Sequence, residues 1–168
     1  RPANGPVRGP WGRSGDDLLL LYTGGTTGMP KGVMWRQDDL FNVLGTGGNA
    51  LFGFAPITSY DELRERSANP PAEPPILLPA CPLMHGTGQF SALIALSMGG
   101  CVVAPPRRHF DPAALWSDVE AYRVAQLVIV GDAFARPLLA ALDAEPGRWD
   151  LTCLRAMTSS GVMWSQET

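Results

Sequence analysis

Short apolar runs alternate with longer amphipathic stretches in the second half of the chain, and this alternation limits the fold more than any other feature. The apolar runs have the length of β-strands and lie at residues 76–80, 101–104, 126–130 and 154–158. The stretches between them carry apolar side chains at helical spacing and lie at residues 88–98, 111–122 and 132–142. The sequence therefore predicts an α/β fold, with a mostly parallel sheet and helices on both faces.

Local signals refine this layout. An Asp-Pro pair at residues 111–112 is typical of a helix start, and a Ser-x-x-Glu capping box at residues 59–62 predicts a short helix. Residues 37–52 have a helical pattern, but the glycines within it predict an irregular helix. Residues 33–36 are expected to return as the second strand of a hairpin. Because ligands of parallel sheets bind beyond the carboxyl ends of strands, the loops after residues 22, 80, 130 and 158 are where a site is expected.

The first of these loops has an unusual composition. An apolar run ends at Tyr22 and is followed by Thr23, Gly24, Gly25, Thr26, Thr27, Gly28, Met29, Pro30, Lys31 and Gly32. Glycines let the backbone approach a polyphosphate, and threonine hydroxyls can donate to phosphate oxygens or bind magnesium. The chain has thirteen basic residues, of which Lys31 is the only lysine. This combination predicts a loop that binds phosphate.

This loop has two alternative interpretations. A Walker A loop is disfavoured, because Pro30 stands where that motif needs its second glycine and Gly32 follows the lysine in place of Ser or Thr. The second alternative is a hairpin turn that is rich in glycine and threonine and binds no ligand.

Residues 22–32 resemble the phosphate-binding signature of the adenylate-forming enzymes, which include acyl-CoA synthetases, luciferases and peptide-synthetase adenylation domains. The usual form is Tyr-Thr-Ser-Gly-Thr-Thr-Gly-x-Pro-Lys-Gly, and Gly24 replaces the serine here. The resemblance implies activation of a carboxylic acid with ATP as an acyl-adenylate. It implies catalytic roles for Lys31 and Thr27, and a hydroxyl of Thr23 that faces Mg²⁺. The residues expected to bind nucleotide are Thr23, Gly24, Gly25, Thr26, Thr27, Gly28, Lys31 and Gly161.

The loop after Ala80 resembles a second signature of the family, Pro-Leu-x-His followed by glycine. In that signature the histidine borders the acyl pocket and the path of the coenzyme A thiol, so the resemblance implies a catalytic role for His85. The alternative is a histidine that is hydrogen-bonded in the core. The loops after Val130 and Thr158 correspond to regions that surround the acyl group and the adenine. The expected contacts to the acyl substrate are His85, Gly131, Ser160 and Gly161.

The nearest relatives suggested by the sequence are actinobacterial fatty-acyl-CoA synthetases, including those that act on sterol side chains. They resemble this chain in the Gly-Val-Met-Trp-Arg-Gln segment at residues 32–37 and in Val-Gly-Asp-Ala at residues 130–133. Small residues beside the expected site, including Gly86 and Ala133, suggest room for a bulky acid. ATP and Mg²⁺ would serve the first half of the reaction, and coenzyme A would be the second substrate.

The resemblance covers only the middle of a family member. Residues 1–15 are expected to form a flexible leader, and residues 16–168 part of the AMP-binding domain, with an insertion or flap at about residues 54–75. The remaining family motifs are expected beyond Thr168, so this piece is expected to be inactive alone and to self-associate through exposed apolar surface. Two alternatives stay open: an acyl-AMP ligase that loads a carrier protein, and a non-catalytic nucleotide-binding or interaction module.

The composition excludes several classes of protein. The 168 residues are 45% hydrophobic and 17% charged, with a net charge of -3, which argues against disorder and against a nucleic-acid surface. No apolar run has the length of a membrane span, and no signal peptide is evident, so a cytoplasmic protein is expected. The three cysteines are expected to be free thiols, and a zinc site formed by Cys81, His85, Cys101 and His109 is the less favoured alternative.

Overall fold

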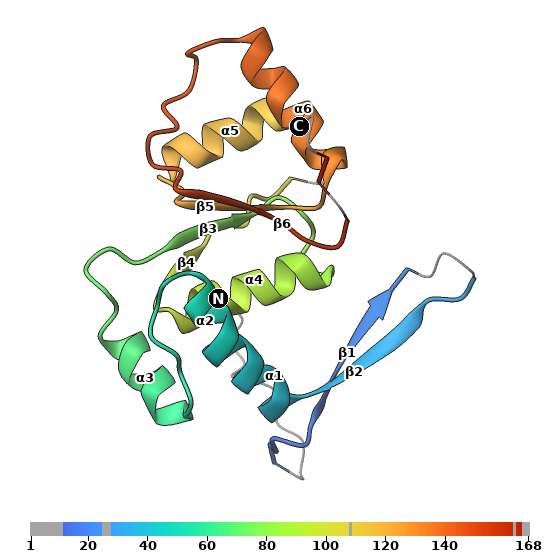
Figure 1. Ribbon diagram of the computed structural model, residues 1–168, viewed down its shortest axis with the longest axis vertical. Coiled ribbons are helices and arrows are strands. Elements are labelled where there is room, and N and C mark those ends of the chain that lie inside the picture. The colour runs from blue at the N-terminus through green and yellow to red at the C-terminus, as the bar shows by residue number, and fades with distance from the viewer. Residues whose placement is uncertain (1–11, 25–27, 108, 163, 166–168) are drawn as a thin grey trace.

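The computed structural model describes residues 12–24, 28–107, 109–162 and 164–165, and its first half contains a hairpin and four helical segments (Figure 1). These are strands β1 (Leu18–Thr23) and β2 (Lys31–Arg36), helices α1 (Gln37–Val43), η1 (Leu44–Gly48, a π-helix), α2 (Asn49–Leu51) and α3 (Tyr60–Ala68). The second half alternates strands with helices: β3 (Ile76–Pro79), α4 (Gly86–Ser97), β4 (Cys101–Val102), α5 (Pro112–Ala121), β5 (Gln126–Ile129), α6 (Asp132–Ala144) and β6 (Ala156–Ser159).

The second half forms the parallel sheet that the sequence predicts. Its strand order is β4-β3-β5-β6, and every neighbouring pair is parallel. Helix α4 covers one face, and α5 and α6 lie together on the other (Figure 1). The expectation of helices on both faces is therefore confirmed. None of the helices among the described residues is long and apolar enough to cross a membrane.

Alternating side chains of the central strands build two apolar layers. Leu78 and Leu127 pack in the cluster that includes Leu115 of α5 and Leu138 of α6. Their neighbours along each strand, Leu77 and Val128, point to the other face, where they meet Ala95 of α4 and Met98, the residue that follows this helix. This follows from the two-residue period of a strand, and it explains why these runs are apolar throughout.

The strand order also indicates where a ligand would bind. The chain goes outward from β3 to β4, then crosses back over β3 to β5 and continues to β6. The direction of winding therefore reverses between β3 and β5, and in open α/β sheets ligands bind outside the carboxyl ends of the strands at such a point. The loops that leave β3, β5 and β6 meet at this edge.

Strands β1 and β2 do not belong to this sheet. They form a separate antiparallel hairpin that projects from the body, with Leu18 opposite Arg36 and Thr23 opposite Lys31 (Figure 1). The predicted return strand is confirmed, but grouping the loop after Tyr22 with the strand ends of the parallel sheet is wrong. The reason is the connection: a short loop returns a strand antiparallel, whereas parallel pairing needs a crossover of a dozen residues or more.

The hairpin has one face toward the body and one toward solvent. Trp35 packs edge-to-face on Phe90 of α4, with 5.7 Å between ring centroids. Leu21 approaches Gly86 so closely that a Cβ atom there would lie 2.9 Å from Leu21 Cδ2. The solvent face is also apolar, and it exposes Leu18, Leu20, Tyr22 and Met34.

The irregular helix predicted for residues 37–52 is confirmed. A π-helical turn at Leu44–Gly48 interrupts it, where the glycines cluster. A Cβ atom at Gly45 would lie 2.6 Å from the Ile57 carbonyl oxygen, so this glycine permits close packing of the following loop. Helix α3 within the predicted insertion begins at its capping box, where the Glu62 backbone N–H donates to Ser59 Oγ at 3.2 Å.

Candidate functional site

His85 lies where β3 leads into α4. The chain turns tightly after the strand, and the His85 backbone N–H donates to the Pro82 carbonyl at 2.9 Å. The imidazole caps α4, because its Nδ1 accepts a hydrogen bond from the Thr87 N–H at 3.2 Å. A neutral imidazole that accepts at Nδ1 carries its proton on Nε2, so that N–H can donate to a ligand. His85 is exposed, so the alternative of a core histidine is wrong.

The cap also explains why α4 begins at Gly86, two residues before the predicted start at Gly88. Gly88 is itself required by close packing, since a Cβ atom there would lie 2.9 Å from the Pro82 carbonyl oxygen. Beneath it, burial raises the pKa of the Cys81 thiol. Cys81 is therefore protonated and inert near neutral pH, which fits a packing residue and not a nucleophile.

Gly161 lies beside His85 at this edge of the sheet. A Cβ atom at Gly161 would lie 3.4 Å from His85 Cε1, and 3.6 Å from both Thr87 Oγ1 and Val130 Cγ1. The backbone of Gly161 has φ of +89°, a conformation that other residues adopt only with strain. The fold thus brings together the loops after β3, β5 and β6, three of the four loops that the sequence grouped, and a Cβ atom at position 161 would contact residues of the other two.

Gly131 and its neighbours hold the middle loop in place. Gly131 has φ 59° and ψ -163°, a region open essentially only to glycine. Its N–H donates to Ser159 Oγ at 2.8 Å, so a serine at the end of β6 fixes the loop after β5. Ser160, the predicted acyl contact, is exposed at the same edge. The Asp132 carboxylate accepts from the Ser165 N–H at 3.2 Å and pairs with Arg136 at 3.2 Å, which ties the last loop to α6.

Thr87 and Ser159 are the residues that sequence reasoning missed at this edge. The only signal for Thr87 was its place two residues after the histidine of the signature. Ser159 lay one position before the predicted Ser160, and its contact with Gly131 joins residues that are far apart along the chain.

The glycine loop sits at the tip of the hairpin. Thr23 and Lys31 form its last strand pair, and the Thr23 hydroxyl donates to the Lys31 carbonyl at 3.4 Å. The Lys31 side chain is exposed, and no ion pair is formed by it among the described residues. Gly28 has φ of +134°, and a Cβ atom at Gly24 would meet nothing within 4 Å. The chain itself therefore gives no steric reason for glycine at position 24. Gly25, Thr26 and Thr27 lie outside the described residues.

The donors present fit a nucleotide better than an independent metal centre. Thr23 supplies one hydroxyl with lone pairs left to bind Mg²⁺ or to accept from water, and Lys31 supplies a cation for phosphate. No group of three or more His, Cys, Asp or Glu residues that could hold a metal ion occurs in the described part of the chain. The zinc alternative thus has no support there, and Mg²⁺ at the loop would depend on phosphate oxygens and water for most of its ligands.

A cavity of about 530 Å³ opens beyond the ends of β3 and β4. Its walls include Cys81, Leu83, Phe110 and Phe134, and none of the predicted acyl contacts lines it. The convergence of His85 with Gly161 and the cavity are thus separate features of the same edge of the sheet.

The fold and the site define a class of α/β protein. Its parallel sheet changes its winding direction between β3 and β5, and a glycine-rich loop lies on a separate antiparallel hairpin. Residues 3–168 match the family described as AMP-binding enzyme, and the chain belongs to this family.

Curated relatives agree with this assignment. The chain is 42% identical over 149 residues to the medium-chain acyl-CoA ligase Mig of Mycobacterium avium, a match that spans 88% of this chain and 26% of that protein. It is 39% identical over 157 residues to the 3-oxocholest-4-en-26-oate–CoA ligase of Rhodococcus rhodochrous, spanning 91% of this chain and 27% of that protein. The chain therefore spans about a quarter of the length of these relatives.

The structure resembles that of the luciferase-like enzyme of the mealworm Zophobas morio. The TM-score is 0.63 at 18% identity, and the match covers 94% of this chain and 32% of that one. At this identity the likeness concerns the fold alone.

Proposed function

We propose that this chain is the part of an ATP-dependent acyl-CoA synthetase that holds the ATP phosphates and borders the acyl group. The observation that carries the proposal is the placement of the hairpin. Leu21 of the hairpin lies against Gly86, and the next residue back along the chain, His85, faces Gly161. The hairpin that carries the glycine loop thus contacts the first turn of α4, next to His85.

In the proposed reaction the carboxylate attacks the α-phosphorus of ATP, pyrophosphate leaves, and the thiol of coenzyme A then displaces AMP. The Lys31 ammonium and the loop N–H groups stabilise charge on the phosphates, together with hydroxyls from Thr23, Thr26 and Thr27. Mg²⁺, when bound, neutralises phosphate charge. The Nε2–H of His85 is free to donate to the acyl carboxylate, and the absence of a side chain at Gly161 leaves room for the acyl-adenylate. Ser160 and Gly131 are proposed to contact the acyl group beside His85 and Gly161.

The substrate class is proposed from the relatives. One is named for medium-chain acids and another for a 3-oxocholestenoate, and both match this chain over nearly its whole length. We therefore expect a fatty acid or another bulky acid as the substrate, with ATP and coenzyme A as co-substrates. These are intracellular metabolites, so a cytoplasmic location is part of the proposal.

The test uses the full-length protein that contains this chain. ATP, coenzyme A and medium-chain, long-chain or steroid acids are supplied in turn, and thioester is measured. Thioester with the bulky acids is expected, and strict preference for acetate would contradict the substrate class. Acyl-adenylate without thioester would favour a ligase that loads a carrier protein. Absence of acid-dependent pyrophosphate exchange would favour a non-catalytic nucleotide-binding module.

The 168-residue chain by itself is expected to bind nucleotide weakly and to lack turnover, since it spans about a quarter of its relatives' length. Pyrophosphate exchange by the purified chain would contradict this.

A further inference from the structure

We propose that Arg36 is a positioning residue that fixes the direction of the β1–β2 hairpin, and with it the glycine loop, relative to the body of the protein. The proposal deepens the proposed function and rests on it, because the loop is taken to bind ATP. Arg36 lies at the base of the hairpin, where β2 runs directly into α1.

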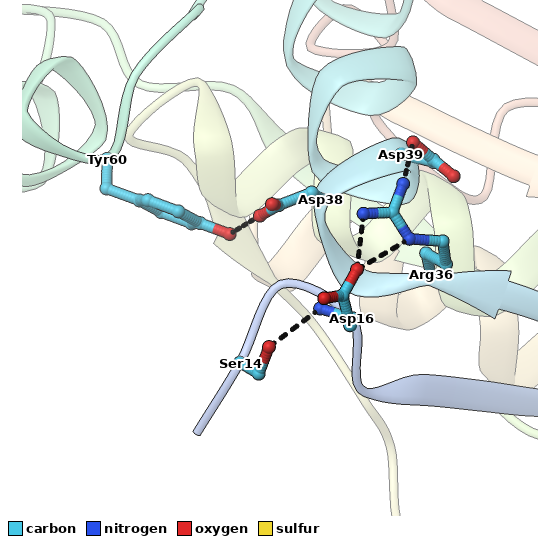
Figure 2. Close-up of polar contacts among 6 residues, drawn as sticks. All are labelled: Ser14, Asp16, Arg36, Asp38, Asp39 and Tyr60. Atoms are coloured by element: carbon cyan, nitrogen blue, oxygen red, sulfur yellow. Dashed lines mark hydrogen bonds and ion pairs between the residues drawn. The ribbon is translucent and has the colours of Figure 1, made fainter. Parts of the chain in front are cut away.

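The Arg36 guanidinium bridges two elements (Figure 2). Its Nε and Nη2 donate to Asp16 Oδ1 at 3.0 and 2.5 Å, and Asp16 lies two residues before the start of β1. Its Nη1 donates to Asp39 Oδ1 at 3.0 Å, in the first turn of α1. One planar group thereby connects the chain entering the hairpin with the helix that leaves it, and the two carboxylates raise the pKa of Arg36.

Backbone contacts reinforce the same base. The Gln37 N–H donates to the Asp17 carbonyl at 2.9 Å, and the Asp38 N–H donates to the Gly15 carbonyl at 3.1 Å. Asp38 in turn accepts from the Tyr60 hydroxyl at 2.8 Å, which connects α1 to α3 (Figure 2). A Cβ atom at Gly15 would lie 1.9 Å from Asp38 Oδ2, so the close approach of these segments depends on glycine.

A small tilt at the base of the hairpin moves the glycine loop by a large distance. Arg36 lies five residue steps along the strand from Lys31, which is a distance of about 17 Å. A tilt of about 10° at the base therefore moves the loop end by about 3 Å, an estimate that uses the same strand rise. Catalytic geometry tolerates about 0.5 Å, which corresponds to a tilt of only about 2° over this length. The backbone hydrogen bonds at the base limit the tilt, so loss of the bridge is expected to misplace the loop partly and not to release it.

The ion pairs themselves are exposed, so their removal is not expected to unfold the protein. A lysine at position 36 would keep the charge but would lose the planar fork that bridges two carboxylates. The predicted effect is therefore on the position of the hairpin and not on charge near ATP.

The experiment compares variants of the full-length protein. Arg36→Gln is expected to lower kcat/KM for ATP about 10-fold, since small misplacements of reacting groups are costly, with no change in Tm. Arg36→Lys is expected to share this loss, and full rescue by lysine would overturn the proposal. Asp16→Asn combined with Arg36→Gln should lose little more than Arg36→Gln alone, because the Arg36→Gln variant has already lost the contact with Asp16. Losses that multiply would contradict the bridge.

The matched control is Arg64→Gln, which removes an exposed ion pair with Asp61 inside α3 and thus joins no separate elements. Hydrogen exchange supplies a readout that needs no activity. The backbone amides of Gln37 and Asp38 should exchange faster in Arg36→Gln and unchanged in Arg64→Gln. Equal exchange in the two variants would overturn the proposal, even if the wild-type protein formed no acyl-CoA. That lack of product would count against the proposed function alone.

Discussion

Replacing Gly161 by alanine would place a methyl group where three loops of the candidate site meet. The new Cβ atom would lie 3.4 Å from His85 Cε1, at the short end of ordinary van der Waals contact. The backbone there has φ of +89°, and a residue with a side chain pays about 1–2 kcal/mol in the left-handed region. If this cost falls on the state that binds the acid, kcat/KM for the acid drops by about 5- to 30-fold.

Gly147 provides a control that separates the effect of backbone strain from the effect of a methyl group at the candidate site. Gly147 has φ of +75°, and a Cβ atom there would meet nothing within 4 Å. Gly147→Ala should therefore lose stability to a similar degree, about 1–2 kcal/mol, without touching the site. Thermal unfolding and acyl-CoA formation are measured for both variants of the full-length protein. Wild-type kcat/KM for the acid in Gly161→Ala, or an equal loss in Gly147→Ala, would refute the role given to Gly161.

Three further outcomes are expected. Lys31→Met should lower kcat/KM by about 100-fold or more through lost phosphate stabilisation, with unchanged Tm because the side chain is exposed; a loss below 3-fold would remove Lys31 from the proposed site. Leu20→Ser combined with Met34→Ser should reduce self-association of the 168-residue chain in light scattering, since both side chains are more than half exposed on the hairpin; a wild-type chain that is already monomeric at high concentration would contradict this. Cys81, whose raised pKa keeps the thiol protonated at pH 8, should react with iodoacetamide far more slowly than exposed Cys101; equal labelling rates by mass spectrometry would show that burial is not protecting it.

The parallel sheet could be predicted from the sequence because each of its strands and helices is indicated by residues within the element or next to it. Asp111 illustrates this: it accepts from the Ala114 N–H at 3.0 Å, and Pro112 stands at the first helical position, as the residue types indicate. The hairpin was harder, since an apolar run such as Leu18–Thr23 looks the same in either kind of sheet. Only the length of the following connection separates the two cases.

The candidate site also has a part that the sequence predicts and a part that it does not. His85 and Gly161 stand in recognisable motifs, and the structure brings them together. The bridge of Arg36 to Asp16 and Asp39 joins residues on either side of the hairpin, and no local pattern marks it. The contact of Ser159 with the Gly131 N–H could not be predicted either. It depends on the register between β5 and β6, which no local sequence pattern gives.

The contact of Leu21 with Gly86 would couple the two binding sites energetically. Gly86 follows His85 directly, and a Cβ atom at Gly86 would overlap with Leu21. A shift of β1 would therefore also move the start of α4, where the His85 imidazole lies. Under the proposed function, nucleotide and acid would act on opposite sides of this single contact. Any factor by which bound acid changes the affinity for ATP must then equal the factor by which ATP changes the affinity for the acid. A larger side chain at position 86 would alter both binding constants together.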